Sequence, residues 1–120
     1  IQTTAILLRS TRDLLDLAQE LSMKEEAEKL EKIEQLLVKG LLSCWRPQLG
    51  RFVSVDLISN QDVEVITQAT FIPLLGLKLD TDQKYAVKSS LEKLLEGVLL
   101  GVPSTPSNSP LFEPKRYWRG

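Results

Sequence analysis

Leucine and other apolar residues recur at intervals of three and four positions through most of the chain, which is typical of amphipathic helices. The first such segment covers residues 3–21. Its apolar positions form one stripe and a flank that widens it: Leu7, Leu14, Ala18 and Leu21, with Leu8, Leu15 and Leu17 beside them. The spacing predicts a helix whose stripe faces the core.

A second helix is predicted over residues 23–45. The run Ser22-Met-Lys-Glu25 has the spacing of a capping box, and Pro47 closes the segment. Residues 36–38 and 41–42 are apolar on nearly every helical face, so this half should be buried all round. The break at Ser22 is short, which favours an antiparallel hairpin of two helices over a single kinked rod.

Residues 48–59 are ambiguous. Residues 52–57 alternate like a half-buried strand, but the apolar positions of 49–57 also fit a short helix. No second run of similar quality could pair with such a strand, and an isolated ribbon is unstable in water, so a helical turn is favoured at 49–58. Ser59-Asn-Gln-Asp62 looks like another helix start, which predicts a helix over 61–72 that Pro73 ends.

The last helix is predicted over residues 81–100, with Asp80 as N-cap and Gln83 in the reciprocal position. Gly101 and Pro103 form a stop signal. The pattern therefore predicts an all-α fold of about four main helices, a small helical bundle or a HEAT-like helical stack, with an extended C-terminal tail. Residues 1–102 would form the helical domain, 103–110 a Pro/Ser-rich linker and 111–120 an aromatic and basic tail segment.

The composition limits which catalytic and binding sites the chain could form. The 120 residues include no histidine and one cysteine, Cys44, so a Cys–His nucleophile is excluded and no internal disulfide can form. A reducing, intracellular compartment, cytoplasmic or nuclear, is expected. Fifteen basic and sixteen acidic residues give a net charge of −1, which provides no global attraction for nucleic acid or an anionic membrane. The chain begins at Ile1, which suggests a domain cut from a longer protein.

No motif supports a cofactor or metal site. The six glycines form neither GxGxxG nor a phosphate-binding loop, and GxSxG is missing. Asp80 and Asp82 lack the glycine and distal glutamate of a calcium loop, and helix capping explains them. A glycosidase-like carboxylate pair remains open in principle because the chain has 16 acids, but most lie beside a basic residue at helical spacing. These observations predict no cofactor, no metal and no enzymatic activity.

The predicted function is a non-enzymatic protein–protein interaction or assembly domain, with self-association as one option. It would bury an apolar helical surface against a second copy or a heterologous helix or peptide. The predicted contact residues lie on the second helix and the tail: Leu36, Leu37, Leu41, Leu42, Trp45, Phe112, Tyr117, Trp118 and Arg119. The alternative is a nucleic-acid-binding module that uses the basic and aromatic tail 115–119 for stacking on single strands.

Overall fold

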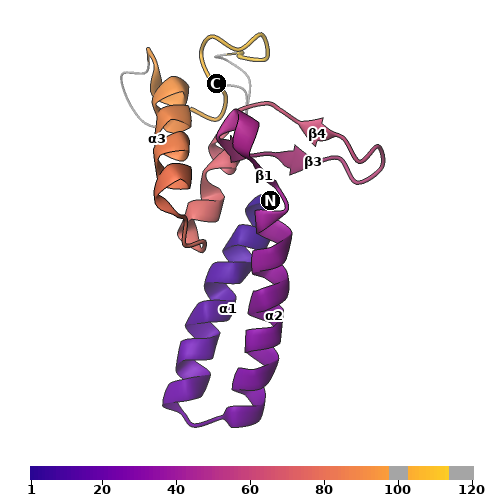
Figure 1. Cartoon of the computed structure of the whole chain (residues 1–120), viewed down its shortest axis with the longest axis vertical. Coiled ribbons are helices and arrows are strands. Elements are labelled where there is room, and N and C mark those ends of the chain that lie inside the picture. The colour runs from indigo at the N-terminus through magenta and orange to yellow at the C-terminus, as the bar shows by residue number, and fades with distance from the viewer. Residues whose placement is uncertain (98–102, 114–120) are drawn as a thin grey trace.

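The computed structural model describes residues 1–97 and 103–113. Within them lie three α-helices, two antiparallel two-stranded sheets and three 3-10 turns. In Figure 1 the helices α1 and α2 form a long hairpin, and the remaining elements gather around its upper end. The helices and strands are α1 (Gln2–Glu20), α2 (Lys24–Leu42), β1 (Trp45–Arg46), β2 (Arg51–Phe52), β3 (Ser54–Val55), β4 (Asp62–Val63) and α3 (Thr81–Leu95). The 3-10 turns are η1 (Pro47–Leu49), η2 (Gln68–Thr70) and η3 (Ile72–Leu75).

The antiparallel hairpin of α1 and α2 is confirmed, but its turn differs from the predicted one. Ser22 does not cap α2, because Met23 is the N-cap residue and makes no capping hydrogen bond with its side chain. Ser22 instead adopts a left-handed conformation with φ 57°. Its amide donates to the Gln19 carbonyl, and the Met23 amide donates to the Ala18 carbonyl at 2.8 Å. This pair of bonds ends α1 as a Schellman motif, so Ser22 completes the first helix rather than starting the second.

The core-facing side of α1 is not the predicted stripe. The buried residues of the helix are Ala5, Leu8, Thr11, Leu15 and Ala18. Of the predicted positions, Leu8, Leu15 and Ala18 are therefore inside. The other four leucines of the prediction are exposed, namely Leu7, Leu14, Leu17 and Leu21. The helix carries apolar residues on two faces, and spacing alone does not say which face the fold covers.

The segment that follows α2 forms two small β-hairpins, so the predicted helical turn at 49–58 is wrong. Strand β1 pairs with β2, with Trp45 opposite Phe52, and β3 pairs with β4, with Ser54 opposite Val63. The Trp45 and Phe52 rings meet edge to face at a centroid distance of 5.0 Å. Each strand is only two residues long, so its partner did not appear as a second alternating run.

The predicted helix over 61–72 is also wrong. Asn60 has a left-handed φ of 55° in the turn that joins β3 to β4, so the chain reverses there rather than entering a helix. The Asp56 carboxylate accepts hydrogen bonds from the amides of Ile58 and Ser59 and stabilises this turn. Residues after β4 reach η2 and η3, and Pro73 lies in the first turn of η3.

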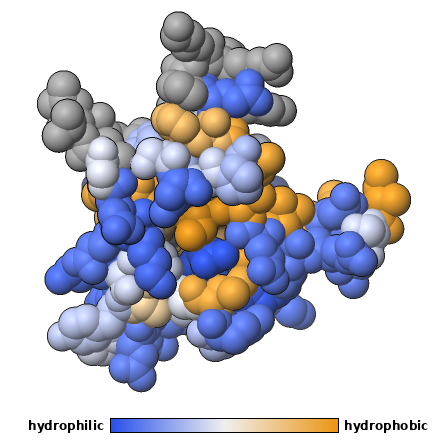
Figure 2. Space-filling view, turned by 90° about the horizontal axis from the view of Figure 1, so that it is seen from above, coloured by the Kyte–Doolittle hydropathy of each residue, from blue (hydrophilic) through white to orange (hydrophobic). Residues whose placement is uncertain are grey.

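The tip of the β3–β4 hairpin is apolar and exposed. Figure 1 shows this hairpin projecting sideways from the rest of the molecule. Its turn carries Leu57 and Ile58, which are 95% and 99% exposed. In Figure 2, which views the molecule from above, hydrophobic side chains lie at the end of this projection and again near the middle of the face. The described residues therefore leave the hairpin tip uncovered.

The fourth predicted helix is confirmed at its start. Asp80 accepts from the Gln83 amide at 2.8 Å, and the Gln83 side chain accepts from the Asp80 amide. Helix α3 ends at Leu95, and Gly97 follows with φ 74°. Its buried side chains belong to Val87, Ser90 and Leu94.

The predicted all-α fold of four main helices is therefore contradicted, because the described residues form three helices and small sheets. The second half of α2 is not buried all round, since Leu36 is 71% exposed while Leu41 is only 1% exposed. Phe52 and Leu41 belong to the larger core cluster, which joins the α1–α2 hairpin to α3 and the segment before it. A smaller cluster holds the far end of the hairpin and consists of Leu15, Ala18 and Ala27.

The division of the chain into 1–102, 103–110 and 111–120 stays a prediction. Within the described part of the last segment, Thr105 and Pro106 are buried. The Ser109 amide donates to the Pro106 carbonyl and the Phe112 amide to the Ser109 carbonyl, so residues 106–112 form successive turns. No helix in the described ranges is long and apolar enough to span a bilayer.

Candidate functional site

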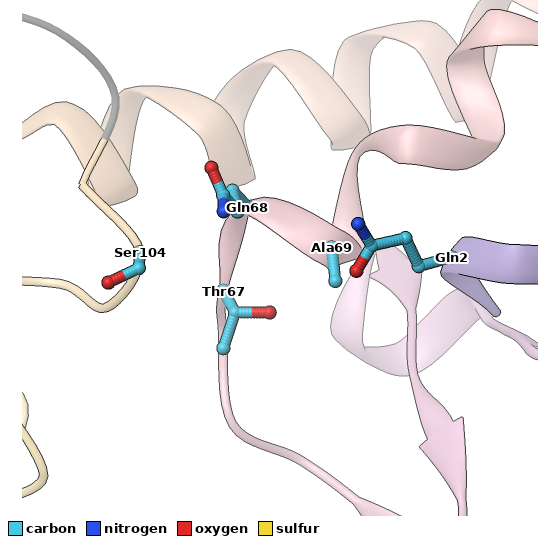
Figure 3. A pocket seen from close by; sticks show the side chains of 5 residues that line it. All are labelled: Gln2, Thr67, Gln68, Ala69 and Ser104. Atoms are coloured by element: carbon cyan, nitrogen blue, oxygen red, sulfur yellow. The ribbon is translucent and has the colours of Figure 1, made fainter. Parts of the chain in front are cut away.

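A polar pocket lies where three distant parts of the sequence meet. It is lined by Gln2 from α1, by Thr67, Gln68 and Ala69 around η2, and by Ser104 from the last described segment. Its volume is about 420 Å³. Figure 3 shows the η2 residues in the middle, with Gln2 on one side and Ser104 on the other. The pocket thus depends on the tertiary fold rather than on any local motif.

The local fold around η2 explains why these side chains stay in place. Thr67 and Thr70 form a reciprocal capping box, in which the Thr67 amide donates to the Thr70 hydroxyl at 3.3 Å. Thr70 is buried, so it anchors the turn that carries Gln68 and Ala69. The capping box therefore holds the backbone of the turn that carries Gln68.

The polar groups of the pocket wall are neutral hydrogen-bonding groups, although apolar atoms make up the larger part of its surface. Gln2 and Gln68 contribute carboxamides with both donors and acceptors, the Thr67 hydroxyl also accepts from the Thr70 amide in the capping box, and no charged side chain stands among the described residues of the wall. Such a set fits a ligand rich in hydroxyl groups. The polar side chains of the wall include neither a general acid nor a general base, so they can bind a ligand but cannot transfer its protons at neutral pH.

An ion pair between Arg46 and Asp62 joins the two β-hairpins. Arg46 donates from Nε to Asp62 Oδ2 and from Nη2 to Asp62 Oδ1, both at 2.6 Å. The hydrogen bonds from Arg46 lower the pKa of Asp62, and the same bonds to Asp62 raise the pKa of Arg46. Backbone hydrogen bonds from Ser59 and Ile58 lower the pKa of Asp56. Both carboxyl groups are therefore anions near neutral pH, which suits structural roles and not proton donation.

Metal binding finds no support in the described part of the chain. Between residues 1 and 97 and between 103 and 113, no three His, Cys, Asp or Glu side chains converge as a metal site would require. Cys44 is half-buried against the larger core cluster, and its thiol lies 3.5 Å from the Gly40 carbonyl oxygen. Cys44 therefore has the surroundings of a residue that packs against the core.

The predicted contact residues do not form one described surface. Leu41 is in the core, and Leu37 and Trp45 pack partly against it. Leu36 and Leu42 are exposed on α2, whereas Phe112 is half-buried far along the chain. The remaining three lie outside the described residues, namely Tyr117, Trp118 and Arg119. Their assignment to a contact stays a prediction.

Sequence reasoning missed the polar pocket entirely. Gln2, Thr67, Gln68 and Ser104 come from three distant stretches of the sequence and share no spacing. A residue at the start of a helix, a short turn and a Pro/Ser-rich stretch give no signal that they meet. Only the folded chain brings them together.

Comparison with known proteins finds similarity to mannosylglycerate hydrolases. Residues 1–120 match the family model of the mannosylglycerate hydrolase MGH1-like glycoside hydrolase domain. The mannosylglycerate hydrolase of Thermus thermophilus is 34% identical over 119 residues, which is 97% of this chain and 28% of that protein. Mannosylglycerate hydrolase MGH1 of Selaginella moellendorffii is 33% identical over 73 residues, which is 61% of this chain and 15% of that protein.

Solved structures agree with the sequence matches. The GH63 mannosylglycerate hydrolase from Thermus thermophilus in complex with glucose has a TM-score of 0.88 and 32% identity. The match covers 99% of this chain and 30% of that one. The same enzyme in complex with Tris and D-glycerate gives a TM-score of 0.87 at 32% identity, covering 99% of this chain and 28% of that one. The chain thus spans less than a third of the length of these relatives.

These findings correct the functional prediction. A whole-chain match to a glycoside hydrolase domain overturns the non-enzymatic interaction or assembly domain, its nucleic-acid-binding alternative and the absence of enzymatic activity. The misleading observation was the lack of histidine, which excludes many catalytic dyads but not carboxylate chemistry. The chain belongs to the mannosylglycerate hydrolase MGH1-like glycoside hydrolase domain family.

Proposed function

We propose that this chain is part of a glycoside hydrolase that cleaves mannosylglycerate to mannose and glycerate. The observation that carries the proposal is the likeness to the Thermus thermophilus mannosylglycerate hydrolase, which extends over 97% of this chain with 34% identity over 119 residues. The TM-score of 0.88 to the structure of a GH63 mannosylglycerate hydrolase also supports it.

Within this enzyme we assign the residues of the polar pocket to binding rather than to proton transfer. Glycosidic hydrolysis commonly needs one carboxylic acid whose pKa is raised and a second carboxylate on the other side of the bond. In the described ranges, the carboxyl groups with a shifted pKa are Asp56 and Asp62, and both are shifted downward. Hydrogen bonds already occupy each of them.

In this enzyme the polar pocket would bind part of the substrate. Mannose is rich in hydroxyl groups, and the carboxamides and hydroxyls of the pocket are neutral donors and acceptors for such groups. A neutral hydrogen bond contributes about 0.5–1.5 kcal/mol net. Gln68 would therefore add a modest part of the substrate affinity without touching the chemical step.

The activity is tested on the protein expressed from its complete reading frame. Mannosylglycerate is supplied beside glucosylglycerate and a mannose disaccharide, and released sugar and glycerate are both quantified. The proposal expects equal amounts of mannose and glycerate from mannosylglycerate, released faster than from the other two glycosides. A folded protein that releases neither product contradicts it.

The role of the pocket is tested with Gln68→Ala in the same protein. We expect KM for the glycoside to rise by about two- to tenfold with kcat nearly unchanged, which is the signature of lost uniform binding. Gln48→Ala removes an exposed carboxamide outside the pocket and is the matched control. Equal KM values for the two variants would remove the pocket from substrate binding.

A further inference from the structure

The Arg12 side chain of α1 joins three separate parts of the fold. Its Nε donates to the Glu34 carboxylate of α2 at 2.6 Å, and its Nη1 donates to the carbonyl of Gly76, the C-cap residue of η3. The side chains of Arg12 and Glu34 are only 28% and 24% exposed. Hydrogen bonds from a guanidinium are stronger than bonds between neutral groups, and its planar fork fixes their directions. Arg12 therefore ties α1 both to α2 and to the end of η3.

Leu8 packs against Gly76 beside this bond. Both residues are buried, and a Cβ at position 76 would lie 3.0 Å from the Leu8 Cγ and Cδ2 atoms. A side chain at position 76 would therefore push the backbone away from α1. A close apolar contact and a charged hydrogen bond thus fix the end of η3 on the helix.

A run of hydrogen-bonded turns connects this fixed point to the polar pocket. The Phe71 amide donates to the Gln68 carbonyl at 3.1 Å, and the Leu74 amide donates to the Phe71 carbonyl at 3.0 Å. The Gly76 amide donates to the Pro73 carbonyl at 3.1 Å. Successive closed turns leave the backbone little freedom between their ends. The place of Gln68 therefore depends on where Gly76 is held.

The opposite wall of the pocket belongs to α1 itself. Gln2 is the first residue of α1 and lies about 15 Å from Arg12 along the helix, at 1.5 Å per residue. Figure 3 shows that Gln2 and Gln68 reach the pocket from different elements, α1 and η2. The separation of the two carboxamides is therefore set by the direction in which the η2–η3 segment leaves its contact with α1 at Gly76.

We propose that Arg12 is a positioning residue for the polar pocket. By holding Gly76 against α1, its guanidinium keeps Gln68 at the distance from Gln2 that a hydroxyl-rich ligand requires. Arg12 is not among the described residues that line the pocket, so it acts through Gln68. A binding group that is held in place before the ligand arrives loses less freedom on binding and contributes more to affinity. The inference rests on the proposed function, in which this pocket binds mannosylglycerate.

Kinetics of the protein expressed from its complete reading frame test the proposal. Arg12→Met removes the guanidinium and keeps an unbranched side chain. Arg9→Met is the matched control, because Arg9 lies on the same helix, is 62% exposed and pairs with Asp13. We expect Arg12→Met to raise KM for mannosylglycerate by about two- to tenfold with kcat nearly unchanged, and Arg9→Met to keep the wild-type KM.

A double variant separates positioning from a general loss of stability. If Arg12 acts through Gln68, Arg12→Met should add little once the carboxamide is gone, so KM should stay close to that of Gln68→Ala alone. Increases in KM that multiply would show a different route and overturn the proposal. Circular dichroism at the assay temperature confirms that each variant is folded.

Amide hydrogen exchange reads the same link without a glycoside. We expect the Phe71, Leu74 and Gly76 amides to exchange faster in Arg12→Met than in the wild type or in Arg9→Met, because their segment has lost its anchor. Unchanged exchange overturns the proposal whatever the value of KM. Faster exchange with a wild-type KM in both Arg12→Met and Gln68→Ala would overturn it together with the substrate role of the pocket, so the two failures are distinguishable.

Arg12→Lys covers the case in which Arg12→Met does not fold. Lysine keeps the charge, but its compact ammonium lacks the planar fork that reaches the Glu34 and Gly76 acceptors in two directions. We therefore expect a raised KM and faster exchange of the Gly76 amide in this variant as well. Wild-type values of both quantities would overturn the proposal.

Discussion

The Arg46 guanidinium binds the Asp62 carboxylate through two parallel hydrogen bonds, each of 2.6 Å. The two residues are 16 positions apart and belong to different sheets, Arg46 to β1 and Asp62 to β4. Arg46 also donates to the Ser43 carbonyl at the end of α2. One side chain therefore links the end of the helical hairpin to the base of the projecting β3–β4 hairpin, and a bidentate geometry fixes direction as well as distance.

Acidification should loosen the β3–β4 hairpin. The pKa of Asp62 in the folded state is lowered from its ordinary 3.8 by the hydrogen bonds from Arg46. The stabilisation by this pair is therefore complete above about pH 4 and is lost as the pH falls through the lowered value. Amide hydrogen exchange across residues 54–63 should show protection factors that fall in this acidic range.

Asp62→Asn is the matched variant for this prediction. It keeps the size of the side chain but removes the charge, so protection of the hairpin should already be reduced at pH 7 and should depend less on acid. The pKa of Asp56, in the same hairpin, is also lowered, so protonation of Asp56 adds to the loss of protection in acid. The variant Asp56→Asn measures that contribution separately. Wild-type protection in Asp62→Asn at pH 7 would show that the pair does not hold the hairpin.

Leu8 and Gly76 form a tight contact that a double-mutant cycle can measure. Leu8 is fully buried, and a Cβ added at Gly76 would lie 3.0 Å from the Leu8 Cγ and Cδ2 atoms. Leu8→Ala should lower the free energy of unfolding by about 2–5 kcal/mol through the cavity it leaves. Gly76→Ala should lower it by about 1–3 kcal/mol through overpacking.

In the double variant, the methyl group added at position 76 enters the space that the Leu8 side chain vacates. The combined loss should therefore be smaller than the sum of the two single losses by at least about 0.5 kcal/mol. Chemical denaturation of the four proteins in parallel gives the coupling. Strict additivity would show that helix α1 and the segment after η3 do not pack as described.

The start of α3 depends on one side chain. Asp80 accepts the Gln83 amide at 2.8 Å, so Asp80→Ala should remove about 1 kcal/mol of helix stability. Asp80→Asn retains an acceptor at the N-cap and should cost only a few tenths of that. Hydrogen exchange in the first turn of α3 is the readout, and equal exchange in the two variants would argue against the capping bond.

Sequence pattern predicted the elements whose signals are local. The three–four spacing located α1 and α2, and the Asp80–Gln83 reciprocal cap located α3. The face of α1 that turns inward was not predictable, because one apolar side with Leu8 and Leu15 and another with Leu14 and Leu17 both follow helical spacing. Tertiary contacts alone choose between two apolar faces.

The β-hairpins were not predicted, for a different reason. Two-residue strands such as Trp45–Arg46 are too short to show a period of two, and their partners lie within a few positions along the chain. Asn60, which is left-handed, lies in a run that resembles a helix start, although the same residue types also form turns. The polar pocket was beyond sequence reasoning since Gln2, Gln68 and Ser104 meet only after folding.

Hydrolysis of mannosylglycerate in water enriched in oxygen-18 tests the central claim most directly. Glycoside hydrolases attack the anomeric carbon, so the protein expressed from its complete reading frame should release mannose that carries the heavy oxygen and glycerate that does not. Mass spectrometry of both products, sampled before the free sugar exchanges its anomeric oxygen with water, reads this result. Correctly folded protein that leaves mannosylglycerate intact, or that places the label in glycerate, would contradict the account.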